Sequence, residues 1–308
     1  MSRTYKPFRG PFAPMLTEFL AQKRALGYQY LSGYWVFRKF DSFSMDYDVV
    51  DYALTKEIVE AWGQKQPNES DVHWTNRILY IQQFSEFLVG QGYSGYITKA
   101  HKSSRSQFKA YVFTHEEMKK IFAAADAMDF SPYSPYKHLS FPLLYRMLYG
   151  CGFRISELLN LKLSDVDTEK GWVHVLHAKN DNERFVPMAE SLTLRCKAYI
   201  SAVHKGHSPD YPFFFKRDGS KYTVGNIEKH FREMLWFAGI PYRGQKNGPR
   251  VHDIRHTFIC HRLNTWAREK ADLMTLLPIL SKYVGHTGVP STQWYLKLTA
   301  EAFPDVLE

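Results

Sequence analysis

The segment VHDIRHTF combines two histidines, an aspartate and an arginine. On a helix, His252 and His256 lie one turn apart around Asp253, which looks like the helical zinc pair of metalloproteases. A zinc site needs three protein ligands, aspartate is shorter than the glutamate expected there, and Arg255 adds an adverse positive charge. His252 and Arg255 instead offer a proton donor or acceptor beside a guanidinium that matches phosphate. The segment therefore favours an anion site over a metal site, and His256 is interpreted as structural or exposed.

A second cationic position follows a glycine break. Gly150 and Gly152 interrupt one helical pattern and RISELLNL begins the next, so Arg154 is expected in the first turn of a helix. The helix dipole disfavours a cation there, whereas the N–H groups at a helix start bind anions. An anion bound beside Arg154 would explain the position, and Glu157 is expected to orient the guanidinium from the same face. The alternative is an ordinary surface arginine.

Three further residues could transfer protons or attack an electrophile. Lys179 lies at the turn of an expected hairpin, where its ammonium could protonate a leaving oxygen, although such turns often carry exposed lysines. His286 lies in a turn flanked by glycines, and Pro290 suits the first turn of the helix that carries Tyr295. Because the chain has 20 tyrosines, Tyr295 is selected as a nucleophile only by its neighbours.

Together these residues resemble the signature of the tyrosine recombinase family, also called phage integrases. The resemblance rests on GFRISELLNL, on HDIRHTF, on GH followed nine residues later by tyrosine, and on ERFVPM as the second hairpin strand. The chain looks most similar to Xer-like and transposon-borne members. It departs from the family at Ala178 and Asn180, where glycine is common beside the hairpin lysine. The six matching residues are, in chain order, Arg154, Lys179, His252, Arg255, His286 and Tyr295.

The resemblance implies a site-specific DNA recombinase or integrase that breaks and rejoins strands through a covalent 3′-phosphotyrosyl intermediate. Tyr295 would be the nucleophile, while the two arginines and His286 would bind the phosphate. His252 would accept the tyrosine proton, and Lys179 would protonate the leaving 5′ oxygen. No step requires a metal or ATP, and the sequence has neither a glycine-rich nucleotide loop nor a carboxylate cluster for magnesium. No cofactor is therefore expected.

The apolar patterns predict a mainly α fold with a small β-hairpin or sheet (α+β). Residues 1–96 contain four helical patterns and are expected to form a helical domain, and residues 112–308 combine helices with the hairpin WVHVLHAKNDNERFVPM. By resemblance, the first is a SAM-like core-binding domain and the second the catalytic domain, and together they form a C-shaped clamp on DNA.

A basic segment, residues 97–111, separates the two expected domains. It contains several serines and cationic residues but no acidic residue, so it cannot bury enough apolar surface to fold alone. The alternatives are a solvated hinge and a linker that follows a phosphate backbone. The cations proposed to bind DNA are Lys99, Lys102, Arg105 and Lys109.

Composition limits the class of protein. In 308 residues, 40 Lys and Arg outnumber 31 Asp and Glu, and the net charge of +9 favours a polyanionic partner. Three widely separated cysteines offer neither a disulfide framework nor a metal knuckle. With no membrane span or signal peptide expected, the sequence predicts a soluble cytoplasmic protein, associated with the nucleoid and encoded by a prokaryote or mobile element.

The resemblance further implies double-stranded DNA sites as partners and a homotetramer on two such sites. The tail LTAEAFPDVLE could dock in a neighbouring protomer or on its own domain. Two alternatives stay open at this point: DNA relaxation of the type IB topoisomerase kind, and a non-catalytic DNA-binding protein of the same fold. The sequence does not distinguish among integration, excision, dimer resolution and transposition, and it does not give the DNA target.

Overall fold

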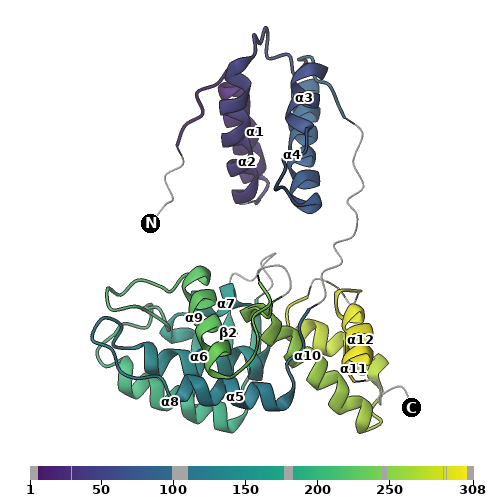
Figure 1. Ribbon diagram of the computed structural model, residues 1–308. Helices are drawn as coiled ribbons and strands as arrows, with labels where there is room; N and C mark the ends of the chain where they lie inside the picture. Colours follow the sequence, from purple (N-terminus) through teal and green to yellow (C-terminus); the bar gives the residue numbers. More distant parts are fainter. Residues whose placement is uncertain are drawn as a thin grey trace. The chain divides into compact units, whose positions relative to one another are not determined.

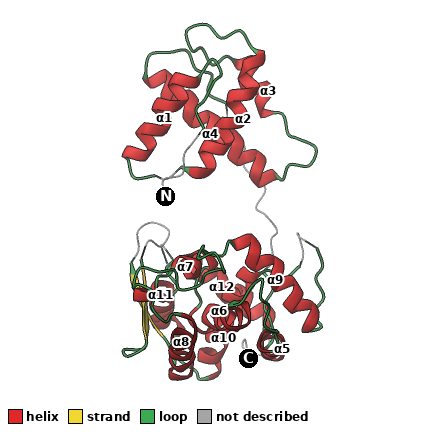
Figure 2. Cartoon of the chain, turned by 90° about the vertical axis from the view of Figure 1, so that its left-hand side faces the viewer, coloured by secondary structure: helices red, strands yellow, loops and turns green. Residues whose placement is uncertain are grey.

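The computed structural model describes residues 6–28, 30–98, 110–176, 183–244, 248–286, 288 and 290–303. Over these ranges the chain is mainly helical, and its three strands form one antiparallel sheet of order β1-β2-β3 (Figure 2). This confirms the predicted mainly α fold with a small sheet. None of the helices in the same ranges is both long and apolar enough to span a membrane.

The chain forms two compact units, Met1–Phe108 and Lys109–Glu308 (Figure 1). The predicted domain limits of 1–96 and 112–308 and the predicted clamp stay predictions. Within the predicted linker, residues 99–109 are outside the described ranges. The proposal that Lys99, Lys102, Arg105 and Lys109 bind DNA therefore also stays a prediction.

The N-terminal unit contains α1 (Ala13–Ala25), α2 (Leu31–Phe43), the short 3-10 helix η1 (Ser44–Asp46), α3 (Lys56–Gly63) and α4 (Asp71–Gly90). Helix α1 ends where Gly27, at φ +87°, lets the N–H of Tyr28 reach back to the Lys23 carbonyl. Helix α4 begins after Ser70, whose hydroxyl accepts from the N–H of His73 and so caps the helix.

Helix α4 contacts each of the other three α-helices of this unit. Its buried Phe84 meets the rings of an aromatic cluster at centroid distances between 5.7 and 6.3 Å. The partners in this cluster are Phe12, Phe19, Phe37 and Phe40. The core of the N-terminal unit is therefore mainly aromatic.

The C-terminal unit begins with α5 (His115–Asp126), which starts with a capping box formed by Thr114 and Glu117. The elements that follow are α6 (Lys137–Cys151), α7 (Ile155–Asn160), η2 (Leu163–Asp165), β1 (Val166–Asp167), β2 (Trp172–Val175), β3 (Arg184–Pro187), α8 (Glu190–Val203), α9 (Val224–Phe237), α10 (Val251–Arg268), α11 (Leu273–Tyr283) and α12 (Pro290–Ala302). Helix α10 contacts α6, α9, α11 and α12, so it is the central helix of this unit (Figure 1).

Strands β2 and β3 pair as the predicted hairpin, with Val173 opposite Val186 and Val175 opposite Arg184. The turn predicted at 180–182 lies outside the described residues. Strand β1 was not predicted, because two residues are too short to show an alternating pattern. Val173, Val175, Arg184 and Val186 are buried, whereas Phe185 is exposed. One face of the hairpin therefore packs inward and places the side chain of Arg184 in the interior.

Replacing Phe84 by alanine should destabilise the N-terminal unit by about 3–5 kcal/mol, because the buried ring leaves a cavity among four other rings. Calorimetric unfolding of the full chain measures this. Leu79→Ala on the exposed face of the same helix is the control, with an expected change within about 0.5 kcal/mol. Equal losses in the two variants would contradict the aromatic core.

Candidate active site

The turn between α6 and α7 sets the position of Arg154. Gly152 ends α6 in the left-handed region, at φ +62°. Arg154 is the N-cap residue of α7, so the prediction that it lies in the first helical turn is wrong by one position. Its main-chain N–H donates to Oε2 of Glu157 at 2.9 Å, and its guanidinium donates to Oε1 at 2.7 Å. The predicted orientation of Arg154 by Glu157 is thus present, with the carboxylate also capping the helix.

Glu157 also binds a second arginine. Arg184, at the start of β3, donates to both carboxylate oxygens at 3.2 and 2.8 Å and to the carbonyl of Tyr283 at 2.9 Å. Both side chains are buried. Burial alone would raise the pKa of Glu157, but the hydrogen bonds and charge of Arg184, together with Arg154, hold it below its ordinary value. One ionised carboxylate therefore joins β3 to α7.

Arg255 lies in α10 and is 1% exposed. Its guanidinium donates to the carbonyls of Gly152 and Val284, both at 2.7 Å. Burial first and the charge of Arg154 second lower its pKa to about 10, so it is still a cation at neutral pH. These carbonyl oxygens compensate part of the free-energy cost of removing the charge from water.

The turn after α11 contacts both arginines of the predicted phosphate site. Arg154 donates to the carbonyl of Gly285 at 2.6 Å, next to the Val284 carbonyl that binds Arg255. Gly285 has φ +69°, and a Cβ there would lie 2.7 Å from Nη1 of Arg184. Any other residue at this position would be strained and would crowd the guanidinium. The glycine of the GH motif is therefore required by the packing of the arginines.

His286 follows this glycine, as predicted, and its Nδ1 lies 2.8 Å from the Thr292 hydroxyl of α12. Its ring lies nearly parallel to that of Tyr295, with centroids 5.8 Å apart. Tyr295 is 4% exposed. Burial raises its pKa to about 12, although the charge of Arg255 acts in the opposite direction. The phenol is therefore protonated at neutral pH and lies beside a charge that favours the phenolate.

The Tyr295 hydroxyl contacts a histidine other than the one predicted. Its Oη lies 2.7 Å from Nδ1 of His256, and both side chains are buried. His252, one turn earlier on α10, packs its ring edge against that of His256 at 4.9 Å between centroids. His256, interpreted from the sequence as structural or exposed, is buried, and that interpretation did not anticipate this contact. Its signal in the sequence was the spacing of four from His252, which puts both rings on one face.

The histidines of the site are neutral at pH 7. Burial first, then neighbouring positive charges that include Arg255, lowers the pKa of His252 and of His286 to about 4. For His256 burial comes first, followed by the interactions with His252 and Arg255, and the pKa falls to about 3. Each imidazole can therefore accept a proton once an anion reduces the local positive charge.

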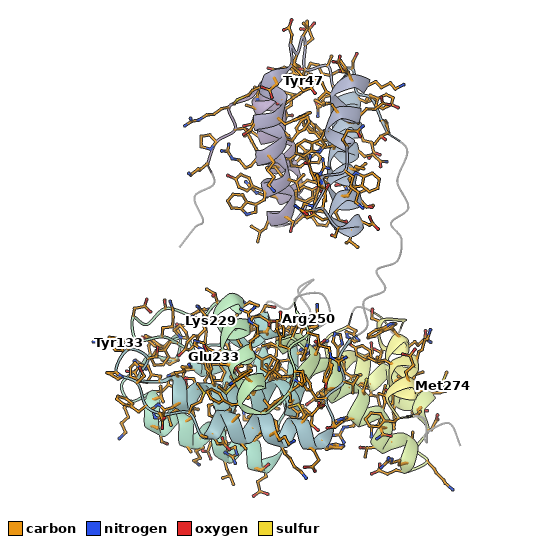
Figure 3. The ribbon with its side chains drawn as sticks, in the orientation of Figure 1. Tyr47, Tyr133, Lys229, Glu233, Arg250 and Met274 are labelled. Carbon is orange, nitrogen blue, oxygen red and sulfur yellow. The ribbon has the colours of Figure 1, made fainter. Side chains whose placement is uncertain are left out.

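The zinc reading of the opening motif does not fit the local geometry. The Asp253 carboxylate accepts from the main-chain N–H of Arg250, the N-cap residue of α10, at 2.8 Å, and so caps its own helix (Figure 3). Among the residues that the structure describes, no three His, Cys, Asp or Glu side chains are grouped so that they could hold a metal ion.

Five of the six signature residues lie within the described ranges. The α6–α7 turn, α10, the α11–α12 turn and α12 bring together Arg154, His252, Arg255, His286 and Tyr295, with Glu157 behind the arginines. Lys179 lies outside the described residues, so its role stays a prediction. Arg184 was missed, although the alternation of ERFVPM puts it on the inward face with Val186.

The chain is similar to known recombinases and integrases. The profile of the Phage integrase family matches residues 111–302. An integrase/recombinase of Sinorhizobium fredii is 28% identical over 96% of this chain and 96% of its own length. The tyrosine recombinase XerA of Pyrococcus horikoshii is 28% identical over 75% of this chain and 72% of its own.

Solved structures show the same fold. The XerH site-specific recombinase bound to palindromic difH substrate, in a post-cleavage complex, has a TM-score of 0.64 and 18% identity, covering 90% of this chain and 78% of that chain. The Tn1549 transposon integrase in complex with circular intermediate DNA has a TM-score of 0.65 and 16% identity, covering 92% and 93%.

Glu157→Gln should lower the free energy of unfolding of the C-terminal unit by about 3 kcal/mol at pH 7, because it leaves Arg154 and Arg184 without their buried counter-charge. Thermal unfolding measures the loss. Glu116→Gln, which removes the charge of an exposed pair with Lys119, is the matched control and should change little.

The same variant should alter acid sensitivity. Because the pKa of Glu157 is lowered on folding, its stabilisation is complete above the ordinary value of about 4.3 and is lost as pH falls through the folded pKa. The difference in stability between wild type and Glu157→Gln should therefore shrink as pH falls below about 4. A difference that is constant down to pH 2 would contradict an ionised Glu157.

Proposed function

Because the chain belongs to the phage integrase family, we propose that it is a tyrosine site-specific recombinase that cleaves and rejoins DNA through a 3′-phosphotyrosyl link. The observation that carries this proposal is the buried Tyr295 hydroxyl beside the guanidinium of Arg255. A phosphodiester repels nucleophiles, so its cleavage needs fixed positive charge, an aligned attack and a proton for the leaving oxygen. The positive charge of Arg255 beside Tyr295 supports the first, binding of the phosphate by the arginines would supply the second, and the third is assigned to Lys179.

Arg154 and Arg255 are suited to bind the non-bridging oxygens of the scissile phosphate. Each guanidinium has five N–H groups, and the hydrogen bonds described above leave others for a ligand. Charge-assisted and bidentate bonds of this kind are the strong ones. Because the protein carbonyls already fix both planes, little reorganisation is needed when the phosphate arrives.

The covalent step balances without an added cofactor. The Tyr295 oxygen attacks phosphorus, the bond from phosphorus to the 5′ oxygen breaks, and the tyrosine proton passes to a neutral histidine, for which His252 is the residue assigned by family resemblance. Lys179 would donate a proton to the 5′ oxygen. The energy of the phosphodiester stays in the phosphotyrosyl bond, so the attack of another strand's 5′ hydroxyl can rejoin the DNA.

The partners of this reaction are double-stranded DNA recombination sites. The relatives include a recombinase bound to difH substrate and a transposon integrase bound to circular intermediate DNA. We propose a homotetramer on two such sites, with the C-terminal tail docking in a neighbouring protomer, and work at the nucleoid or on a mobile element. Family membership does not favour the two alternatives, type IB relaxation and DNA binding without cleavage.

Wild-type protein mixed with labelled, nicked DNA from the regions flanking its own gene should form a covalent adduct in excess EDTA, whereas Tyr295→Phe should form none, because phenylalanine lacks the attacking oxygen. A denaturing gel detects the adduct as a slowly migrating band. An adduct that persists in Tyr295→Phe would identify another nucleophile. Its absence from wild type despite tight binding would favour the non-catalytic alternative, and relaxation of plasmids without specific sites would favour the topoisomerase.

DNA binding should depend steeply on salt. With about 6 to 10 phosphates neutralised, affinity should fall by roughly 10³ to 10⁵ between 50 and 200 mM salt. Titration of labelled DNA at several salt concentrations gives the slope. Nearly constant affinity over that range would contradict an extensive contact with the DNA backbone.

A further inference from the structure

The tyrosine nucleophile has a direct hydrogen-bond partner that its family signature does not assign. Tyr295 Oη lies 2.7 Å from Nδ1 of His256, across the contact between α10 and α12. His256 is 8% exposed and Tyr295 is 4% exposed, so water has little access to either polar atom. The two rings lie 5.5 Å apart between centroids at an angle of 36°. The pair is therefore a specific buried contact at the reacting atom.

The protonation of the two groups limits this hydrogen bond to two arrangements. The phenol is protonated, and the imidazole is kept neutral by burial and by the positive charges around it. The direction then depends on the imidazole tautomer: with the imidazole proton on Nε2 the phenol donates to Nδ1, and with the proton on Nδ1 the imidazole donates to the phenol oxygen. In the first tautomer the O–H is directed at His256, and the lone pairs of the tyrosine oxygen are directed elsewhere and open to an electrophile.

Neighbouring side chains limit the freedom of both rings. His252 packs edge-on against His256 from the preceding turn of α10, and Trp294 lies 5.8 Å from His256 between centroids. His286 lies nearly parallel to the Tyr295 ring on α12's side of the site. The contact thus holds its geometry through packing on both helices.

We propose that His256 is a further catalytic residue, which through Nδ1 holds the Tyr295 hydroxyl with its lone pairs open toward the phosphate. The proposal rests on the function proposed above and adds a residue to it. His256 contacts the hydroxyl directly, and His252, which keeps the role of proton acceptor proposed above, packs edge-on against the His256 ring. A hydroxyl without this acceptor would rotate or stay unsatisfied in a buried site, and fewer tyrosines would be aligned for attack.

The test compares asparagine and leucine at position 256. The two residues have side chains of similar size and shape, but only asparagine offers an acceptor near the position of Nδ1. His256→Leu should slow formation of the covalent adduct by about tenfold or more, whereas His256→Asn should be within about threefold of wild type. DNA affinity should be unchanged in both variants, because the phosphate is bound by Arg154 and Arg255, whereas His256 is hydrogen-bonded to the nucleophile.

The chain offers a matched control on the same helix. His261 is also buried, and its Nδ1 lies 2.8 Å from the hydroxyl of Tyr149, which is not the nucleophile. His261→Leu removes a similar contact between a histidine and a tyrosine. It should lower the melting temperature without changing the rate of adduct formation per folded molecule.

The outcomes separate this proposal from the one on which it rests. Equal rates for His256→Leu and wild type, or equal slowing by leucine and asparagine at equal thermal stability, would overturn the role of His256. Lack of an adduct in wild type would instead overturn the proposed function. If His256→Leu does not fold, His256→Gln replaces it, since its amide lies one carbon further out, near Nε2, and should not restore the rate that asparagine restores.

Discussion

The site depends on holding like charges close together in the interior. Arg154 and Arg184 share the single carboxylate of Glu157, and Arg255 lies near enough for the charge of Arg154 to lower its pKa. Three guanidiniums around one carboxylate would repel one another without further partners. Main-chain carbonyls supply those partners, from Gly152, Tyr283, Val284 and Gly285. The carbonyls of the turns after α6 and α11 thus hold the arginines in place, and the same hydrogen bonds stabilise the conformation of the turns.

Burial first and this excess of positive charge second lower the pKa values of the histidines around the arginines. The three histidines are neutral, while the tyrosine keeps its proton because it is buried. A bound phosphodiester would bring the negative charge that the site lacks, raise the affinity of the histidines for protons and let one of them take the tyrosine proton. The resting site is therefore complementary to an anion that it does not itself contain.

Much of the fold could be predicted from local patterns, and the candidate site only in part. The helices and the hairpin follow from apolar period, caps and turn residues, and Arg154, His252, Arg255, His286 and Tyr295 were found from motifs. Strand β1 was not predicted, because a strand of two residues shows no alternating pattern. Arg184 and His256 were missed for another reason. Arg184 binds Glu157, which is 27 positions away in sequence, and His256 contacts Tyr295, which is 39 positions away. Spacing shows which residues share a face, but it does not show what that face meets.

The partners of Arg255 have a consequence for how such a protein can change over time. Its two hydrogen-bond acceptors are peptide carbonyls, which every amino acid carries, so no side-chain replacement at those positions deletes them. Only a change of backbone path would do so, and glycines at positive φ in both turns maintain that path. The position of the Arg255 guanidinium is therefore maintained by the backbone path of two turns and not by the identity of a partner side chain.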